Sequence, residues 1–377
     1  MIQKTYKNLY FILFVLFLSL PLLQMLFPIV KVKPLKGSFR ETKIPKMSVS
    51  NWFSGKYSIE FENYINDSIG FRPWMVRVHH QIQFSCFDKI NTQNVVRGKN
   101  GFLFETSYIN SFNGKDYLGK NKINEKIEKI KLLQSLLAEK NITLLICLAP
   151  GKATYYSEYF PDGLVSRSTD STNYKQFSSA LKENQINHID FNSWFLNMKD
   201  TCNCELFPKY GIHWSFYGML QATDSLINYI EKERNISMPR YKYSKINHYK
   251  IPKYSDYDIA ESMNLMFRLH ADPMCYPDYR IEENIGSHKP KTLVISDSFY
   301  WSMYNVGIGK DIFSWGGFWY YNEVIYPESF NKQLLVKEVD VKQKILENEV
   351  IIIMATESNL SNFGWNFIES ANSLLKK

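Results

Sequence analysis

The pattern of hydrophobic positions begins with one long apolar run near the start of the chain. Residues 9–30 read LYFILFVLFLSLPLLQMLFPIV and contain no charged side chain. A helix rises about 1.5 Å per residue, so this run spans roughly 33 Å and is long enough for a hydrocarbon core of about 30 Å. It ends in Phe27, Pro28, Ile29 and Val30, with no cleavage site of small residues. It therefore favours an uncleaved transmembrane anchor over a cleaved signal peptide.

The residues around this run suggest how the chain is divided. Residues 1–8 would be a cytoplasmic N-terminus, residues 31–50 a polar tether and residues 51–377 the main domain. Lysines lie on both sides of the run, at positions 4 and 7 before it and 31, 33 and 36 after it. This near balance leaves a cytoplasmic main domain as the alternative. Because long C-terminal domains translocate largely regardless of nearby charge, we expect the main domain in the periplasm or outside the cell, with the anchor in the inner membrane.

Beyond the tether the apolar pattern alternates between two periods. Residues 51–90 are predicted to be mostly helical, and residues 95–104 to form a hairpin around Asn100-Gly101. Helical spacing then recurs over 123–137, 174–184 and 216–234, whereas short apolar runs typical of buried strands occupy 142–149, 186–191, 292–296 and 350–355. This alternation predicts an α/β fold with a mainly parallel sheet covered on both faces. In such sheets the chemistry lies beyond the C-terminal ends of the strands.

Charge and cysteine content narrow the classes of partner. The net charge of +8 would suit an anionic glycan or membrane surface, or it could simply be spread over solvated faces. The chain has no dense basic stripe interleaved with aromatic residues, so we do not expect a nucleic-acid partner. The five cysteines are an odd number, and Cys202 and Cys204 are too close in sequence to pair readily with each other. We therefore predict neither a metal site nor a disulfide framework, and no cofactor.

Two segments at predicted strand ends could carry chemistry. Ser298 follows the strand 292–296 on a turn into a helix, where it could act as a nucleophile or merely cap the helix. Amides at that helix start, including that of Phe299, would be natural oxyanion donors. His213 lies just before a helix among aromatic residues, so it could accept a proton from a serine or simply satisfy a loop carbonyl. Trp214 and Tyr217 could form the wall of a sugar-binding cleft.

Other side chains near strand ends are weaker candidates. Lys152 follows the strand 142–149 and could meet an anionic group or face solvent. The side-chain amide of Asn322 could donate to an oxyanion. Trp319 and Tyr320 could line a sugar cleft, and the alternative for them is ordinary aromatic core.

Four short stretches together resemble a known family. They are residues 96–104, residues 149–152 with Tyr155 and Glu158 beyond them, His213-Trp214, and residues 296–299. In order and spacing they resemble the alginate O-acetyltransferase AlgJ/AlgX-like family, also called DHHW-type proteins, across roughly residues 60–370. The resemblance implies a three-layer SGNH hydrolase-like fold with Ser298 as nucleophile and His213 as base. The histidine precedes the serine in the chain, which implies a permuted order of the same sheet.

One position departs from the family pattern. The family's acidic residue commonly lies two positions before the histidine, where this chain has Gly211. Because a carboxylate orients the imidazole and stabilises its charged form, another acid would have to replace it. The sequence leaves Asp258, Asp297 and Glu357 open as the third member. Asp190, at the end of the strand 186–191, has a plausible structural role.

The resemblance implies an extracytoplasmic O-acyltransferase that acetylates a polysaccharide. The same residues would serve a carbohydrate acetyl esterase, and the missing acid at position 211 leaves a catalytically impaired glycan-binding or assembly protein as a further alternative. No acetyl-coenzyme A is supplied outside the cytoplasm. A transferase there would therefore need an acyl group from a multi-spanning membrane partner, in addition to its polysaccharide substrate and the membrane itself.

Overall fold

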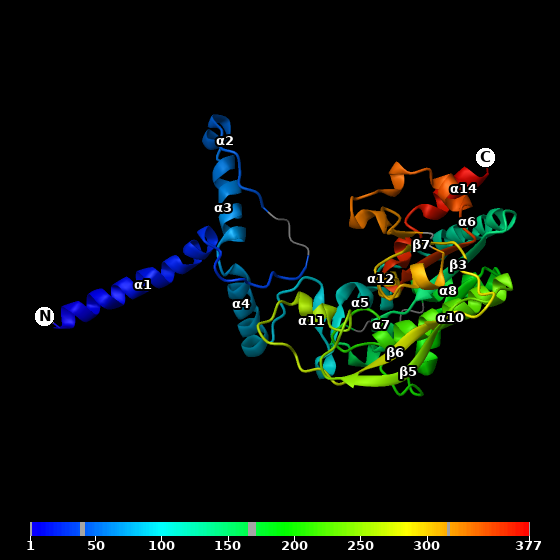
Figure 1. The fold of residues 1–377 in the computed structure, drawn as a ribbon, viewed down its shortest axis with the longest axis horizontal. Coiled ribbons are helices and arrows are strands. Elements are labelled where there is room, and N and C mark those ends of the chain that lie inside the picture. The colour runs from blue at the N-terminus through cyan, green and yellow to red at the C-terminus, as the bar shows by residue number, and fades with distance from the viewer. Residues whose placement is uncertain (1, 38–41, 165–170, 315–316, 377) are drawn as a thin grey trace. The chain divides into compact units, whose positions relative to one another are not determined.

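The computed structural model describes residues 2–37, 42–164, 171–314 and 317–376, so residues 38–41 of the predicted tether lie outside the described part (Figure 1). The chain divides into two compact units. The first comprises residues 1–93 together with 260–269, and the second comprises residues 94–259 together with 270–377.

The first unit is built from helices. Its N-terminal helix α1 (Ile2–Leu26) contains a segment, Tyr6–Leu26, that is long and apolar enough to cross a membrane. This helix fits a single-pass anchor or a signal sequence. It ends before Val30, whose backbone N–H and C=O both bond the side chain of Gln24. Three further helices follow, namely α2 (Val49–Phe53), α3 (Lys56–Ser68) and α4 (Arg72–Phe87).

The second unit is organised around a six-stranded sheet. The strand order is β4-β3-β10-β7-β8-β9, and every pairing is parallel except that of β9 with β8. The strands are β3 (Thr143–Ala149), β4 (His188–Asp190), β7 (Thr292–Ser296), β8 (Phe318–Tyr320), β9 (Val324–Tyr326) and β10 (Val350–Thr356). The central strands β3, β7 and β10 are buried almost throughout, as continuous apolar runs in a parallel sheet should be.

Helices cover both faces of this sheet (Figure 1). On one face α6 (Lys120–Ala138), α8 (Asn173–Glu183) and α14 (Phe367–Leu375) enclose the main hydrophobic core. On the other face lie α9 (Phe191–Met198) and α10 (Phe216–Arg234). Arg234, at the end of α10, bonds Thr143 at the start of β3. The predicted three-layer α/β fold with a mainly parallel sheet is confirmed.

A short hairpin precedes the sheet, as predicted. Its strands β1 (Val95–Arg97) and β2 (Leu103–Glu105) pair antiparallel, and α5 (Thr106–Phe112) follows them. A second antiparallel pair, β5 (Arg240–Tyr249) and β6 (Met274–Glu282), was not predicted. Polar residues occupy most of β5, so its sequence lacks the apolar signal of a buried strand.

We predicted no disulfide framework, yet the structure has a disulfide bond. Cys204 and Cys275 are bonded, with their Cα atoms 5.8 Å apart. They are separated by 71 residues, and Cys275 lies on the unpredicted strand β6. The sequence could not reveal this pairing because nothing in it places β6 beside the loop of Cys204. Cys86, Cys147 and Cys202 remain free thiols.

Candidate active site

Ser298 lies immediately beyond the C-terminal end of β7, on the turn that leads into α12 (Tyr300–Asn305). The buried carboxylate of Asp297 fixes this turn. One of its oxygens accepts a hydrogen bond from the Phe299 N–H at 3.1 Å, and the other accepts one from the Thr356 N–H at 2.8 Å. The turn is thereby attached to the end of the neighbouring strand β10.

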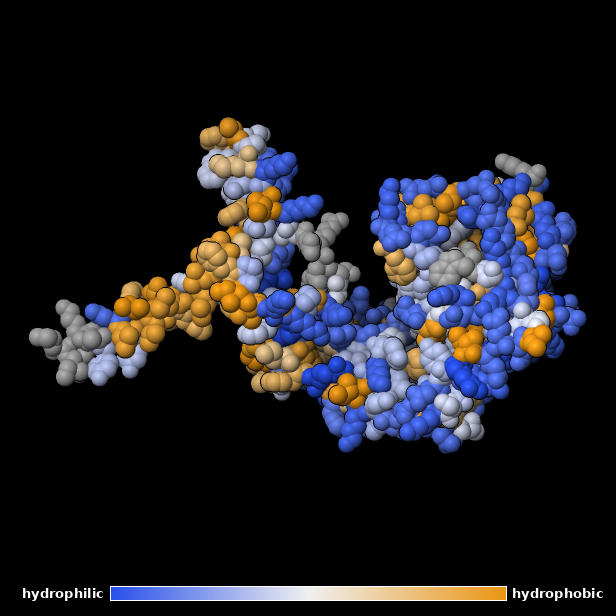
Figure 2. Space-filling view, viewed as in Figure 1, coloured by the Kyte–Doolittle hydropathy of each residue, from blue (hydrophilic) through white to orange (hydrophobic). Residues whose placement is uncertain are grey.

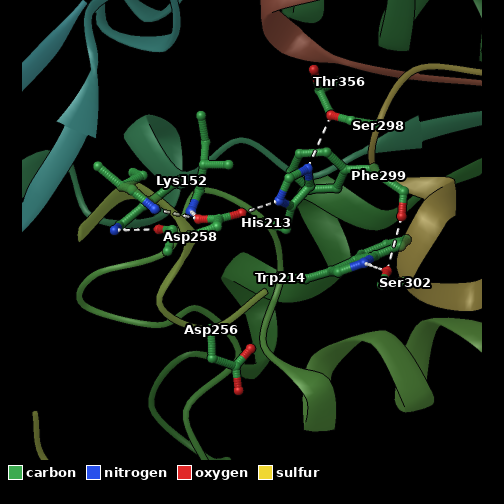
Figure 3. Close-up of polar contacts among 12 residues, drawn as sticks. Lys152, His213, Trp214, Asp256, Asp258, Ser298, Phe299, Ser302 and Thr356 are labelled. Carbon is green, nitrogen blue, oxygen red and sulfur yellow. Dashed lines mark hydrogen bonds and ion pairs between the residues drawn. The ribbon is translucent and has the colours of Figure 1, made fainter. Parts of the chain in front are cut away.

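His213 connects this serine to an acid from a distant segment (Figure 3). Its Nε2 lies 2.9 Å from the Ser298 Oγ, and its Nδ1 lies 2.6 Å from an oxygen of Asp258. A carboxylate can only accept, so the Nδ1 carries the proton and donates it to Asp258. In that tautomer Nε2 is left with a lone pair directed at the Ser298 hydroxyl, which is the arrangement a general base requires.

Asp258 is held in place from both sides. Its second oxygen, Oδ1, accepts hydrogen bonds from the backbone N–H groups of Ile212 at 2.8 Å and Ile259 at 2.7 Å. Ile212 directly precedes His213, so the carboxylate bonds both the imidazole and the loop that carries it. Of the three acids left open by the sequence, Asp258 is the one in hydrogen-bond contact with His213.

The other two acids have different partners. Asp297 holds the serine turn, as described above. Glu357 is buried beyond β10, where its carboxylate accepts hydrogen bonds from Thr154 and Asn192, and burial raises its pKa to about 7. Asp190 accepts a hydrogen bond from the Ser193 N–H at 2.9 Å and so caps the N-terminus of α9, which agrees with the structural role predicted for it.

Close packing explains why position 211 carries no side chain. A Cβ at Gly211 would lie 2.6 Å from the carbonyl oxygen of Ser255 and 3.0 Å from the carbonyl carbon of Asp256. The segment that brings Asp258 to the imidazole therefore passes through the space that a side chain at 211 would need. The acid from residue 258 and a larger residue at 211 exclude each other sterically.

The charges around His213 favour its protonated form. Burial lowers the pKa of the imidazole, but the charge and hydrogen bond of Asp258, with further contributions from Asp297 and Glu105, outweigh burial and raise that pKa above its ordinary value. The same crowding acts on Glu105, whose pKa is raised by burial and by the nearby charge of Asp258. An imidazolium formed during a reaction would therefore be stabilised where it forms.

Lys152 is not at the surface, so it does not have the predicted role of contacting a substrate. Its side chain is 1% exposed, and its Nζ donates to the backbone carbonyls of Lys209 at 2.9 Å and Gly211 at 2.6 Å. Burial lowers the pKa of Lys152 to about 7, while Asp258 and Glu105 oppose that shift. The ammonium therefore ties the end of β3 to the loop that carries His213.

Both predicted oxyanion donors already donate a hydrogen bond to another acceptor. The Phe299 N–H donates to Asp297, and the Asn322 side-chain amide donates to the Trp365 carbonyl at 2.9 Å. The expectation for Phe299 is wrong because its single N–H holds its own turn. The amide of Asn322 uses one of its two N–H donors in this way, so its role stays a prediction. Nothing in the sequence identifies those local acceptors.

A pocket of about 340 Å³ opens over Ser298 and His213. Its walls are mainly aromatic, and they include Trp214, Phe216, Tyr254, Tyr279 and Trp301. Of these, only Trp214 was predicted. Trp301 follows Ser298 by three residues and could have been inferred from the helical spacing, whereas Tyr254 and Tyr279 come from unpredicted segments and carry no comparable signal.

The predicted cleft residues differ in where they lie. Trp214 lines the pocket but is fully buried, and its indole N–H donates to the Ser302 Oγ at 2.6 Å, which braces the helix behind Ser298. Trp319 is buried in the core against Phe367, on the opposite face of the sheet. Tyr217 and Tyr320 are absent from the described lining of the pocket. A metal site is not evident either, since the described residues contain no group of three or more potential ligands.

Residues 95–257 match the family model described as "SGNH hydrolase-like domain, acetyltransferase AlgX". This match confirms the predicted resemblance and the expectation of an enzyme of the SGNH type. The matched segment contains Lys152 and His213 and ends before Asp258 and Ser298. No protein with a curated description matches the sequence.

Several solved structures are similar at low identity. The O-acetyltransferase domain of Pseudomonas putida AlgJ is 15% identical, with 74% of this chain and 99% of that one covered and a TM-score of 0.49. Pseudomonas aeruginosa AlgX is 12% identical, with 76% and 67% covered and a TM-score of 0.45. Bacillus cereus PatB1 is 12% identical, with 71% and 96% covered and a TM-score of 0.41.

Proposed function

We propose that this chain is a membrane-anchored O-acyltransferase that acetylates a cell-surface or exported polysaccharide through Ser298. The observation that carries the proposal is the hydrogen-bonded series Ser298–His213–Asp258 beneath an aromatic pocket. Series of this kind activate a serine for acyl transfer on many unrelated folds. The AlgX-type match over residues 95–257 supports acetyl as the acyl group.

The first half of the reaction would load the enzyme. The Ser298 Oγ attacks the carbonyl carbon of a donor acetyl ester as its proton passes to His213 Nε2. The tetrahedral intermediate collapses when the imidazolium returns that proton to the departing oxygen of the donor. The products are the free donor alcohol and an acetyl ester on Ser298, and Asp258 stabilises the imidazolium between the two steps.

The second half would unload the enzyme onto the sugar. A polysaccharide hydroxyl gives its proton to His213 Nε2 and attacks the acetyl carbonyl. The Ser298 oxygen then leaves and recovers the proton, which releases the acetylated sugar. The aromatic rings of Tyr254, Tyr279 and Trp301 give the pocket apolar faces against which a sugar ring can stack. Water in place of the sugar hydroxyl would make the same site an esterase.

Two features support a location outside the cytoplasm. The helix segment Tyr6–Leu26 has the length and composition of a membrane span. The bond between Cys204 and Cys275 is of a kind that persists in oxidising compartments and is rare in the cytosol. An extracytoplasmic transferase has no acetyl-coenzyme A within reach, so a multi-spanning membrane protein that passes acyl groups across the bilayer would be its donor partner.

Acceptor competition tests the proposal. The full chain in detergent receives an activated acetyl ester with or without a panel of neutral and anionic oligosaccharides, and the products are acetylated sugar and free acetate. We expect acetylated sugar to form at the expense of acetate with at least one oligosaccharide, and neither product above background with Ser298→Ala. Acetate release that no oligosaccharide diverts would replace the transferase with an esterase. Equal, background-level turnover by both proteins would exclude an enzyme.

A further inference from the structure

The helices that follow α1 expose an unusual amount of apolar surface. Neither α2, α3 nor α4 contains a buried residue. Phe53 is 84% exposed and Ile59 is 64% exposed. Figure 2 shows hydrophobic residues continuing from α1 onto the helices beside it. A monomeric soluble protein rarely leaves so much contiguous apolar surface in water, so something covers it.

Helix α4 exposes an apolar stripe on one side. Four of its apolar side chains form a stripe at helical spacing, and each is more than two-fifths exposed: Trp74, Met75, Val78 and Ile82. Two others, Val76 and Phe84, are partly buried. The stripe is therefore the solvent-facing side of the helix in this unit.

Several polar side chains of α4 make hydrogen bonds within the unit. Arg77 donates to the carbonyls of Lys33 and Pro34 at 2.8 and 2.7 Å. His80 bonds the Met263 carbonyl at 2.8 Å, and Gln81 accepts from the Phe267 N–H at 3.0 Å. A water-exposed helix would place these groups outward and the stripe inward.

The corner between α3 and α4 is attached to the end of the apolar helix α1. The Gly70 N–H donates to the Pro21 carbonyl at 3.0 Å. A Cβ at Gly70 would lie 2.4 Å from that oxygen and 2.5 Å from the Cβ of Gln24, so only glycine permits this approach. If Tyr6–Leu26 spans the membrane, this contact holds the start of α4 beside the last turns of the span.

We infer that the stripe of α4, together with the exposed apolar residues of α2 and α3, lies in the headgroup–acyl boundary of a bilayer leaflet. The inference rests on the membrane anchor of the proposed function. Tryptophan favours this boundary, and Trp52 and Trp74 are the two tryptophans among residues 1–93. Helix α4 contains no acidic residue that would oppose burial of its stripe in this boundary. The occupant of this face is thus lipid.

Fluorescence quenching by brominated lipid tests this placement. The full chain is reconstituted in phosphatidylcholine–phosphatidylglycerol vesicles with bromine on the acyl chains near the carbonyls, and membrane association is verified by flotation. We expect the double variant Trp52→Phe/Trp74→Phe to lose about half or more of the wild-type quenching, because interfacial tryptophans lie within reach of these bromines. The matched control Trp194→Phe, on α9, should retain it.

The outcomes separate this inference from the anchor. A chain that floats while the double variant is quenched as strongly as wild type would overturn the inference and leave the anchor standing. If a protein partner rather than lipid normally covers Trp52 and Trp74, these two residues would not be quenched in lipid vesicles. That result too would overturn the inference and leave the anchor standing. A chain that does not float would overturn both. As a second variant, Val78→Lys/Ile82→Lys should float yet show weaker quenching than wild type.

Discussion

Replacing Asp258 by asparagine tests the hydrogen-bonded series at its least expected member. The Oδ1 of Asp258 accepts two backbone N–H groups, those of Ile212 and Ile259. An asparagine side chain would keep its oxygen at those two donors and turn its NH₂ toward His213 Nδ1. Because an NH₂ group can only donate, Nδ1 would have to become the acceptor, and the proton would move to Nε2. The imidazole could then no longer accept a proton from Ser298.

The expected cost follows from this change of tautomer. In serine-triad enzymes the corresponding aspartate-to-asparagine change lowers kcat by about 10⁴, equivalent to about 5 kcal/mol of transition-state stabilisation. We therefore expect Asp258→Asn to lose roughly 10⁴-fold in acetyl-ester turnover with an unchanged fold by circular dichroism. The matched control is Asp256→Asn, two residues earlier, whose carboxylate bonds Phe216 N–H and Tyr276 rather than His213. It should retain most of the activity.

The pH dependence gives a second reading of the same interaction. His213 must be neutral to accept the serine proton, so activity falls as the pH drops through its pKa. Burial lowers that pKa, but Asp258, Asp297 and Glu105 together raise it to a greater extent, which sets the acid limb of wild-type kcat/KM above the ordinary histidine value of 6.5. Without the carboxylate charge, the residual activity of Asp258→Asn should have its acid limb at lower pH. Loss of less than tenfold in turnover, or an acid limb that does not move, would refute the assignment of Asp258.

Three further predictions follow from contacts around the site. Gly211→Ala should lower turnover by roughly 10²-fold and the unfolding free energy by about 1–3 kcal/mol. Its Cβ would lie 2.6 Å from the Ser255 carbonyl oxygen, which is 0.8 Å closer than the 3.4 Å at which ordinary contact begins. A wild-type kcat and melting temperature would contradict this prediction. Lys152→Met should reduce kcat more than it changes KM. Between pH 7 and 10 the unfolded lysine keeps its proton, whereas the folded lysine, with a pKa of about 7, has released it. The wild-type free energy of unfolding, measured by urea titration, should therefore rise over this range more steeply than that of Lys152→Met. Parallel slopes would argue against a buried, titrating lysine. Replacing Cys204 and Cys275 by serine should cost about 4 kcal/mol of unfolding free energy for a loop of 71 residues, and an unchanged urea midpoint would contradict the bond.

Much of the second unit could be predicted because its signals are local. The runs that became β3, β7 and β10 are apolar over their whole length, and such runs are typical of strands buried on both faces. Positions next to strand ends then indicated Ser298, and the aromatic setting before α10 indicated His213. Each of these inferences needs only a few neighbouring residues.

The parts that could not be predicted depend on long-range packing. Asp258 is 45 residues from His213 in sequence, and only the folded path of its segment past Gly211 brings the two together. Lys152 follows a strand as a solvent-facing or ligand-binding lysine would, yet the loop of Lys209 and Gly211 folds over it. Burial of this kind is a property of the tertiary structure, so neither residue type nor spacing reveals it.

The central claim is that Ser298 carries the acyl group as a covalent ester. Brief incubation of the full chain with an activated acetyl ester, acid quenching and peptide mass spectrometry would locate that group directly. We predict an acetyl adduct on the peptide containing Ser298, its disappearance on addition of an acceptor oligosaccharide, and its absence from Ser298→Ala. Acetyl transfer by Ser298→Ala at the wild-type rate, or an acetyl group that accumulates on another residue and is passed on from there, would contradict the account.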